Sequence, residues 1–491
     1  MYLLGIDIGT SACKAAAFTL TGELAAKAAK SYPVSYPQQG WAQQDARVWF
    51  RAAADAVREI TQKIDAAQIV GVGVDGQSWS CIPVDKNGQV LADTPIWTDT
   101  RAASQCEWLD REIGREAIYA VCKNPMQPTY TTPKVLWFKD VCPEIYQRTA
   151  CFLQSNSYIV YRLTGRLSQD RSQGYGHFFY DMHKECYDAS LAAAMGLNLS
   201  LFPELYDCDT VVGKVLSEAA SLTGLKEGTP VVAGGLDAAC AALGAGVFEP
   251  YCTQEQGGQA GGMSICVDAP LGHEKLILGS HVVRGRWLLQ GGTTGGGGAI
   301  KWFSELFGAA FGDSEQLLHI DKAAQTVEAG SEGLIFLPYL AGERSPVWNP
   351  KARGVYFGLT YDKTRAHMAR ATMEGVCYSL LHNLETAREA GAVVTRMRAV
   401  GGSANSAVWT QMKADVTGIP IDVPYADEAA TLGAALLAGV GTGVYRDYAE
   451  AVQKTVTIRA SYLPNRQKEA VYRKGYQNYL DLYEHVKELM I

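Results

Sequence analysis

Two short apolar segments, each running into an aspartate beside glycines, constrain the fold of this 491-residue chain more than any other feature. Tyr2–Ile6 leads into Asp7-Ile8-Gly9-Thr10-Ser11, and Val231-Val232-Ala233 leads into Gly234-Gly235-Leu236-Asp237. The N–H groups and hydroxyls of such turns can receive an anionic oxygen, and the aspartate can hold a metal-bound water. Each turn alone is also typical of a plain hairpin. Two of them, about one large domain apart and followed by a glycine-rich stretch, indicate phosphate binding much more strongly.

The spacing of apolar residues predicts alternating strands and helices, and therefore an α/β fold. Lys14–Phe18 is expected to return from the first turn as the second strand of a hairpin, with a further turn at Thr21-Gly22. Asp45 is expected to cap a helix. Ile69–Val74 has the continuous apolar character of a buried strand.

The predicted domains are residues 1–248 and 249–491. The chain is glycine-rich between about 228 and 300, as it often is where backbone approaches a ligand closely. The run Gly295-Gly296-Gly297-Gly298, taken alone, is expected to form flexible loops instead. Past residue 442 the sequence becomes polar and helical, which predicts a surface helical tail.

The composition argues against several classes of protein. The formal net charge is −7, from 44 Lys and Arg against 51 Asp and Glu, with no basic cluster, so no nucleic-acid partner is expected. The N-terminus lacks a basic segment, and Asp237 interrupts the apolar stretch 231–248, so neither secretion nor a membrane span is expected. The 12 cysteines include no C-x-x-C and the 8 histidines no H-E-x-x-H, which disfavours disulfide, iron–sulfur and zinc sites. These features favour a cytoplasmic enzyme.

Short motifs along almost the whole chain point to one family. No G-x-x-x-x-G-K-[ST] is present, which disfavours a Walker-type site. The motifs found are Asp7-x-Gly9-Thr10-Ser11-x-x-Lys14, Gly40-Trp41-Ala42-Gln43-Gln44-Asp45, Trp97-Thr98-Asp99-Thr100-Arg101, Pro133-Lys134-Val135-Leu136-Trp137, Gly342-Glu343-Arg344-Ser345-Pro346, Gly358-Leu359-Thr360 with Ala371-Thr372-Met373-Glu374, Gly401-Gly402-Ser403-Ala404-Asn405-Ser406 and Leu432-Gly433-Ala434-Ala435. In this order they resemble the FGGY carbohydrate kinases, a family of the sugar-kinase, actin and chaperone-ATPase superfamily.

The resemblance implies two actin-like (ribonuclease H-like) ATPase domains of the α/β class, with the catalytic site in the cleft between them. It also implies ATP and Mg²⁺ as cofactors, and in-line phosphoryl transfer to a sugar hydroxyl. Asp237 matches the family's catalytic base, and Asp7 would bind Mg²⁺ through water. The residues that would contact ATP and its phosphates are Thr10, Ser11, Lys14, Gly258, Gln259, Gly401, Gly402 and Ser406.

These residues also have ordinary structural interpretations. Asp237 could cap a helix, and Asp7 could form a turn. Lys14 could be a solvated lysine at the end of a hairpin, and each glycine could serve a tight turn. The surrounding motifs favour the functional interpretation for Asp237 and Gly402 most clearly.

Three departures from the family pattern concern the two substrates. Gly258-Gln259-Ala260-Gly261 replaces G-T-[SG]-G, which removes a hydroxyl expected to contact the β-phosphate, although the Gln259 amide can donate a hydrogen bond. Gly76-Gln77-Ser78-Trp79 replaces the G-Q-M-H of xylulokinases, and Ala238 replaces an amide after Asp237. The expected sugar-site residues are therefore Gln77, Ser78, Trp79 and Asp237. Trp79 could stack on a sugar face or pack in the core.

The resulting hypothesis is an ATP-dependent sugar kinase of the xylulokinase-like branch, with D-xylulose as the leading substrate. Alternatives are a kinase for another ketose, a polyol or a sugar acid, and a catalytically weak sugar- or nucleotide-binding regulator. A small-molecule sugar is the expected partner. Whether the chain acts as a monomer or a homodimer is left open.

Overall fold

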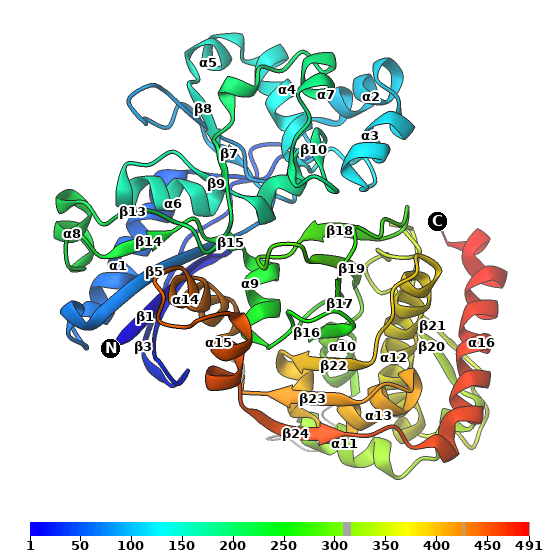
Figure 1. Ribbon diagram of the computed structural model, residues 1–491. Helices are drawn as coiled ribbons and strands as arrows, with labels where there is room; N and C mark the ends of the chain where they lie inside the picture. The colour runs from blue at the N-terminus through cyan, green and yellow to red at the C-terminus, as the bar shows by residue number, and fades with distance from the viewer. Residues whose placement is uncertain (308–315, 426–427, 491) are drawn as a thin grey trace.

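The computed structural model describes residues 1–307, 316–425 and 428–490 and contains two α/β domains (Figure 1). The first is built on a sheet with strand order β13-β14-β5-β1-β2-β3, and β15 also pairs with β5. The strands are β1 (Tyr2–Ile8), β2 (Ala12–Thr19), β3 (Leu24–Ser31), β5 (Ile69–Gly76), β13 (Val211–Lys214), β14 (Pro230–Val232) and β15 (Gly235–Leu236). β1, β2 and β3 are antiparallel, whereas β5 runs parallel to β1 and β14. The predicted opening hairpin and the strand at Ile69–Val74 are confirmed.

Helices flank this sheet and form a cap beyond it. Asp45 begins α1 as predicted, because its carboxylate accepts a hydrogen bond from Arg47 N at 2.9 Å. The helices are α1 (Ala46–Thr61), α2 (Ala103–Glu112), α3 (Arg115–Cys122), α4 (Thr131–Val141), α5 (Pro143–Arg148), α6 (Ser155–Thr164), α7 (Ala189–Ala194), α8 (Ser217–Thr223) and α9 (Asp237–Gly244). Short strand pairs accompany them, made by β4 (Gln43–Gln44), β6 (Ile82–Val84), β7 (Thr94–Pro95), β8 (Cys151–Leu153), β9 (Gln169–Asp170), β10 (Tyr180–Asp181), β11 (Cys186–Tyr187) and β12 (Leu205–Tyr206).

The second domain repeats the arrangement of the first sheet. Its strand order is β18-β19-β17-β16-β22-β23-β24, in which β16, β17 and β19 are antiparallel neighbours and β22 and β23 run parallel to β16. The strands are β16 (Cys252–Gly257), β17 (Gly261–Val267), β18 (Ile277–Ser280), β19 (Trp287–Thr293), β22 (Arg396–Val400), β23 (Ile421–Pro424) and β24 (Ile458–Tyr462). The two strands β20 (Ile335–Leu337) and β21 (Val355–Phe357) pair separately. This domain also contains α10 (Gly297–Phe307), α11 (Gln316–Gln325), α12 (Arg365–Glu389), α13 (Ala407–Thr417) and α16 (Glu469–Val486).

Short 3₁₀ helices complete the described secondary structure. They are η1 (Ala66–Gln68), η2 (Arg171–Gly176), η3 (Leu199–Leu201), η5 (Ser331–Gly333), η6 (Gly402–Asn405), η7 (Arg466–Lys468) and η8 (Lys487–Leu489). Within the described ranges, no helix has both the length and the apolar character needed to cross a membrane.

The chain returns to the first domain after most of the second is complete. Helix α14 (Ala429–Gly441) lies against β1 and β5 and beside α9 (Figure 1). The contact is close: a Cβ added to Gly5 or Gly73 would collide with backbone oxygens of α14. Residues 429–441 thus belong structurally with the first sheet, although the sequence division at 248 places them in the second domain.

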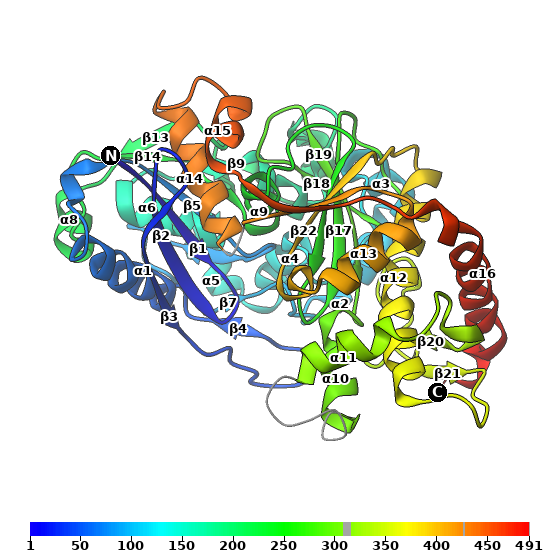
Figure 2. The same ribbon diagram turned by 90° about the horizontal axis from the view of Figure 1, so that it is seen from below.

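The C-terminal segment is more than the expected helical tail. It begins with α15 (Tyr448–Thr455) and ends with α16 (Figure 2), but β24 lies between them and pairs antiparallel with β23 (Figure 1). β24 was missed because its exposed positions carry polar side chains such as Arg459 and Ser461, which weakens the apolar signal of an edge strand.

Candidate active site

A cavity of about 390 Å³ lies between the two domains and contains much of the predicted site. Its lining from the first domain includes Thr10, Gln77, Ser78, Trp79 and Asp237. From the second domain it includes Gly258 and Gln259, with residues of β17 and β19 and Arg344. The residues that the sequence assigns to sugar and those that it assigns to phosphate therefore face one shared cavity.

Three carboxyl groups meet near the strand ends of the first sheet. Asp7 on β1 is directly opposite Asp75 on β5, and Asp75 is opposite Gly235 of β15, two residues before Asp237. Burial raises the pKa of Asp7, and burial together with the charges of Asp7 and Asp237 raises the pKa of Asp75. Burial, then the charge of Asp7, raises the pKa of Asp237 to about 7.

These carboxyls suit a hydrated cation better than a preformed cage. No N–H or hydroxyl donor of the described residues reaches Asp7 Oδ1 or either oxygen of Asp75, so the two carboxyls can share a proton or face a cation. In the described part of the chain, no group of three or more His, Cys, Asp or Glu side chains is placed to hold a metal by itself. Mg²⁺ commonly uses one or two carboxylates and keeps several waters, so this pair fits it.

Asp75 is the main residue that the sequence analysis missed. It ends a strand as Val74-Asp75-Gly76, the same kind of strand-end aspartate as Asp7. That local pattern could have identified it. Its position beside Asp7 depends on the pairing of β5 with β1, which the motifs do not specify.

The first turn is held rigidly beside the cavity. Trp97 Nε1 donates to Thr10 Oγ1 at 2.9 Å, and Gln44 Nε2 donates to the Thr10 carbonyl at 2.9 Å. Thr10 lines the cavity, whereas Ser11 and Lys14 are exposed on the same hairpin and are outside the lining described above. Lys14 is opposite Asp7 across the hairpin, and its charge opposes the increase in the pKa of Asp7.

Trp79 both packs in the core and lines the cavity. Its side chain is 8% exposed and stacks on Tyr130, with the ring centroids 4.1 Å apart. It also lines the cavity beside Ser78, whose hydroxyl accepts a hydrogen bond from Tyr175 at 3.1 Å. Lys134 Nζ donates to the carbonyls of Trp79 at 2.9 Å and Ile96 at 2.7 Å. Lys134 thus holds two segments of the cavity wall together.

At two of the predicted nucleotide-site glycines, an added Cβ would meet no close contact. A Cβ on Gly402 would have Gly257 O as its nearest neighbour at 4.0 Å, and one on Gly258 would be 3.6 Å from Ala260 O. Gly401 differs, because its φ of 85° is in the left-handed region and its Cβ would be 2.9 Å from Gly257 O. Gly401 is thus needed for the backbone, whereas Gly402 and Gly258 leave room for a ligand.

Ser406 and Asp237 each have a local helix role beside their predicted function. Ser406 caps α13, since its hydroxyl accepts from Trp409 N at 3.0 Å. Asp237 is the first residue of α9 rather than its cap, and its carboxylate accepts from Ala238 N at 2.6 Å. One carboxylate oxygen of Asp237 can therefore be held by the helix while the other faces the cavity.

The four-glycine run is not the set of flexible loops that was expected. Gly297 N donates to Gly258 O at 2.7 Å, and Gly298 N donates to Gln259 O at 2.9 Å. A Cβ on Gly296 would collide with the backbone of Ala260. The run packs tightly against the loop that carries Gln259, and glycine is needed for that approach. Local composition could not distinguish this from flexibility, because the partner loop is remote in sequence.

Three of the family motifs, distant in sequence, meet in the first domain. The Arg101 guanidinium lies 3.7 Å from the ring centroid of Trp41 and forms a buried ion pair with Asp99 at 2.8 Å. Trp41 and Trp137 contact edge to face at 5.3 Å. Arg344 was predicted only as part of a family motif, yet it is exposed in the cavity lining together with Asp237, which carries the opposite charge when ionised.

Comparison with known proteins agrees with this architecture. Models of the N-terminal and C-terminal domains of the FGGY family of carbohydrate kinases match residues 2–244 and 266–442. A xylulose kinase of Bacillus subtilis is 30% identical, covering 99% of this chain and 98% of its own. The structure of a xylulose kinase from Rhodospirillum rubrum superposes with a TM-score of 0.92 at 28% identity, covering 100% of both chains. The structure of a gluconate kinase from Lactobacillus acidophilus superposes with a TM-score of 0.90 at 26% identity, covering 99% of this chain and 98% of its own. These neighbours confirm the expected fold of two actin-like domains.

Proposed function

Because the chain belongs to the FGGY family of carbohydrate kinases and is an ATP-dependent sugar kinase, we propose that it phosphorylates a pentulose, with D-xylulose as the leading substrate. The observation that carries this proposal is the cavity between the domains. It brings Asp237 and the Trp79 wall of one domain opposite the Gly258–Gln259 turn of the other. A sugar on the first side and the γ-phosphate of ATP on the second would be neighbours there. We also propose a cytoplasmic location, where ATP is available.

In the proposed reaction Asp237 is the general base. Its carboxylate would orient the acceptor hydroxyl and take its proton as the new O–P bond forms and the bond to ADP breaks. A pKa near 7 leaves a substantial fraction of Asp237 ionised at neutral pH. Trp79 would offer an apolar face to the sugar, and Gln77 and Ser78 are adjacent polar groups.

The remaining residues would place and neutralise the phosphates. The open spaces beside Gly258 and Gly402 would admit ATP, and Thr10 would approach its terminal phosphate. Asp7 and Asp75 would hold Mg²⁺, mainly through water, and the ion would supply neutralisation of phosphate charge when bound. Lys14 and Ser11 are assigned a weaker part, since both are exposed outside the cavity lining described above.

A sugar acid is the second candidate substrate. Arg344 places an exposed guanidinium in the cavity lining, and a guanidinium suits a carboxylate. The similar gluconate kinase from Lactobacillus acidophilus points in the same direction. D-xylulose remains first because xylulose kinases match over the whole chain.

A coupled assay of ADP release over pentuloses, hexuloses, polyols and sugar acids tests the proposal. D-xylulose should give the highest kcat/KM, with little ADP release when sugar is absent. A higher kcat/KM for an aldonic acid than for D-xylulose would show that the substrate is a sugar acid. Binding of ATP and sugar without turnover would instead support a regulator.

A further inference from the structure

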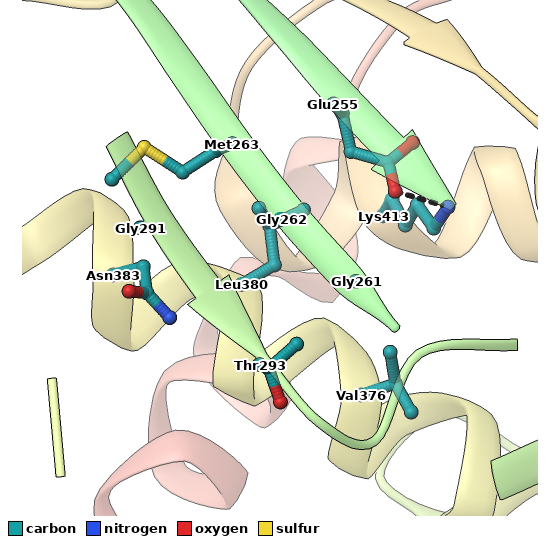
Figure 3. A pocket seen from close by; sticks show the side chains of 10 residues that line it. All are labelled: Glu255, Gly261, Gly262, Met263, Gly291, Thr293, Val376, Leu380, Asn383 and Lys413. Carbon is teal, nitrogen blue, oxygen red and sulfur yellow. Dashed lines mark hydrogen bonds and ion pairs between the residues drawn. The ribbon is translucent and has the colours of Figure 1, made fainter. Parts of the chain in front are cut away.

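A buried ion pair lies behind the proposed nucleotide site, next to a small internal cavity of about 10 Å³ (Figure 3). Lys413 Nζ is 2.7 Å from Glu255 Oε1, and the two side chains are only 2% and 5% exposed. The same Nζ donates to Ser403 Oγ at 2.7 Å. One ammonium group from α13 thus contacts both β16, which carries Glu255, and η6, which carries Ser403.

These two contacts lie beneath the two loops assigned to ATP. β16 ends at Gly257 and continues into Gly258 and Gln259, whereas Ser403 directly follows Gly401 and Gly402. The loops touch, because a Cβ added to Gly257 would collide with Ser403 Oγ and lie 3.3 Å from Lys413 Nζ. Lys413 itself does not line the cavity between the domains described above. It can therefore affect nucleotide only through the loops.

The energetics favour a geometric role over a purely stabilising one. A buried ion pair is often no more stable than apolar residues of similar size, because both charges lose their hydration. No donor of the described residues reaches Glu255 Oε2, so this pair is incompletely compensated. What the pair does provide is a short, directional link between two segments that are far apart in sequence.

We propose that Lys413 is a positioning residue that sets the spacing of the two nucleotide-binding loops by joining Glu255 to Ser403, and thereby sets the affinity for ATP. This inference rests on the proposed role of those loops. Lys413 would thus change the affinity for ATP without contacting the nucleotide.

The test compares ATP affinity, measured by calorimetry without sugar, in K413M, S403A and the K413M/S403A double variant. Loss of a hydrogen bond to a charged group should weaken ATP binding by about tenfold in K413M. Because Lys413 acts through Ser403, the double variant should bind ATP no more weakly than K413M alone. The KM for sugar should stay at its wild-type value. Independent, additive losses from the two substitutions, or an equal rise in the KM for sugar, would overturn the proposal.

Two further variants separate positioning from stability. E255L/K413M removes both charges, so its melting temperature should recover relative to K413M, while ATP binding should stay weak. Recovery of both properties would overturn the proposal. The matched control is K468M. Lys468 Nζ forms an ion pair with Asp415 of α13 at 3.3 Å, and Lys468 contacts neither of the two loops through this pair. K468M should bind ATP like the wild type, and weakening equal to that of K413M would count against a specific link. A wild type that binds ATP but phosphorylates no sugar would contradict the proposed function alone.

Discussion

Asp237 is placed so that its environment favours a base over a fixed counter-ion. It is half-buried at the start of α9, where loss of hydration and the charge of Asp7 raise its pKa to about 7. Asp237→Asn keeps the shape and removes the base, so kcat should fall by about 10² to 10⁴, with ATP affinity unchanged. Steady-state kinetics and nucleotide titration measure both. Activity within about tenfold of wild type would exclude Asp237 as the base.

Trp79 should affect stability and sugar binding together. It stacks on Tyr130 and also lines the cavity. Trp79→Ala should reduce the free energy of unfolding by about 3 to 5 kcal/mol and raise the KM for sugar, with no effect on the KM for ATP. Trp79→Phe keeps a stacking ring and should show smaller changes in both. Loss of stability with an unchanged KM for sugar would show that Trp79 packs in the core and does not contact the sugar.

Lys134 predicts an unusual dependence of stability on pH. Burial lowers its pKa from 10.5 to about 7. Below pH 7 both states carry the charge, so the folded state bears the full cost of burying it. Between pH 7 and 10 the folded state has released the proton and the unfolded state has not, so this cost falls as pH rises. A neutral amine still has two N–H groups, one for each carbonyl that Lys134 contacts.

The stability of wild type relative to Lys134→Met should therefore increase with pH from 7 to 10, by up to about 1.4 kcal/mol per pH unit. Urea unfolding of both proteins at pH 7, 8 and 9 measures the difference. The comparison cancels the titration of other groups. A difference that stays constant with pH would show that Lys134 keeps its proton in the folded protein.

Among single residues, the sequence predicted the site residues that lie in a recognisable local motif. It missed a residue that reaches the site only because two strands pair in the fold. Asp7, Thr10 and Asp237 stand beside glycines at the ends of apolar runs, so their positions could be inferred directly. Asp75 shares that local pattern, but its significance comes from pairing with Asp7. Trp79 could not be assigned to core or cavity, because it belongs to both.

Among the elements, η6 lies between β22 and α13 and carries Gly402, one of the residues predicted to contact ATP. A valine at position 402 would enter open space, so Gly402→Val should fold normally and raise the KM for ATP much more than the KM for sugar. Gly401→Val is the contrasting variant, since its positive φ and short contact predict loss of stability. Thermal unfolding and both KM values distinguish them. Equal effects of Gly402→Val on both substrates would contradict the nucleotide assignment.

The elements that sequence patterns predicted well have strong local signals. α1 has a capping aspartate and a regular apolar face, and the opening hairpin has its glycine turn. The start of α10 and the edge strand β24 lacked such signals. In α10 the glycines are explained only by the loop they contact, and β24 gains its stability by pairing with β23.

On the scale of the whole molecule, the domains are not consecutive halves of the chain. Helix α14 comes late in the sequence but covers β1, β5 and α9. Tyr445 Oη then donates to the Leu20 carbonyl at 3.1 Å, which extends the contact toward the first strands. The motif Leu432-Gly433-Ala434-Ala435 lies within α14, but nothing local specifies which sheet this helix covers.

This crossing predicts that residues 1–248 cannot fold stably alone. Without α14, apolar faces of β1, β5 and α9 would be exposed to water, and their burial is the main source of stability for such a layer. The fragment 1–248 should therefore show no cooperative urea unfolding, whereas 1–248 joined by a flexible linker to residues 428–457 should show it. Leu437 is completely buried in α14, so Leu437→Asp in the joined fragment should abolish the gain. Cooperative unfolding of 1–248 alone, at the same urea concentration as the joined fragment, would mean that α14 contributes to alignment of the two domains and not to the folding of the first.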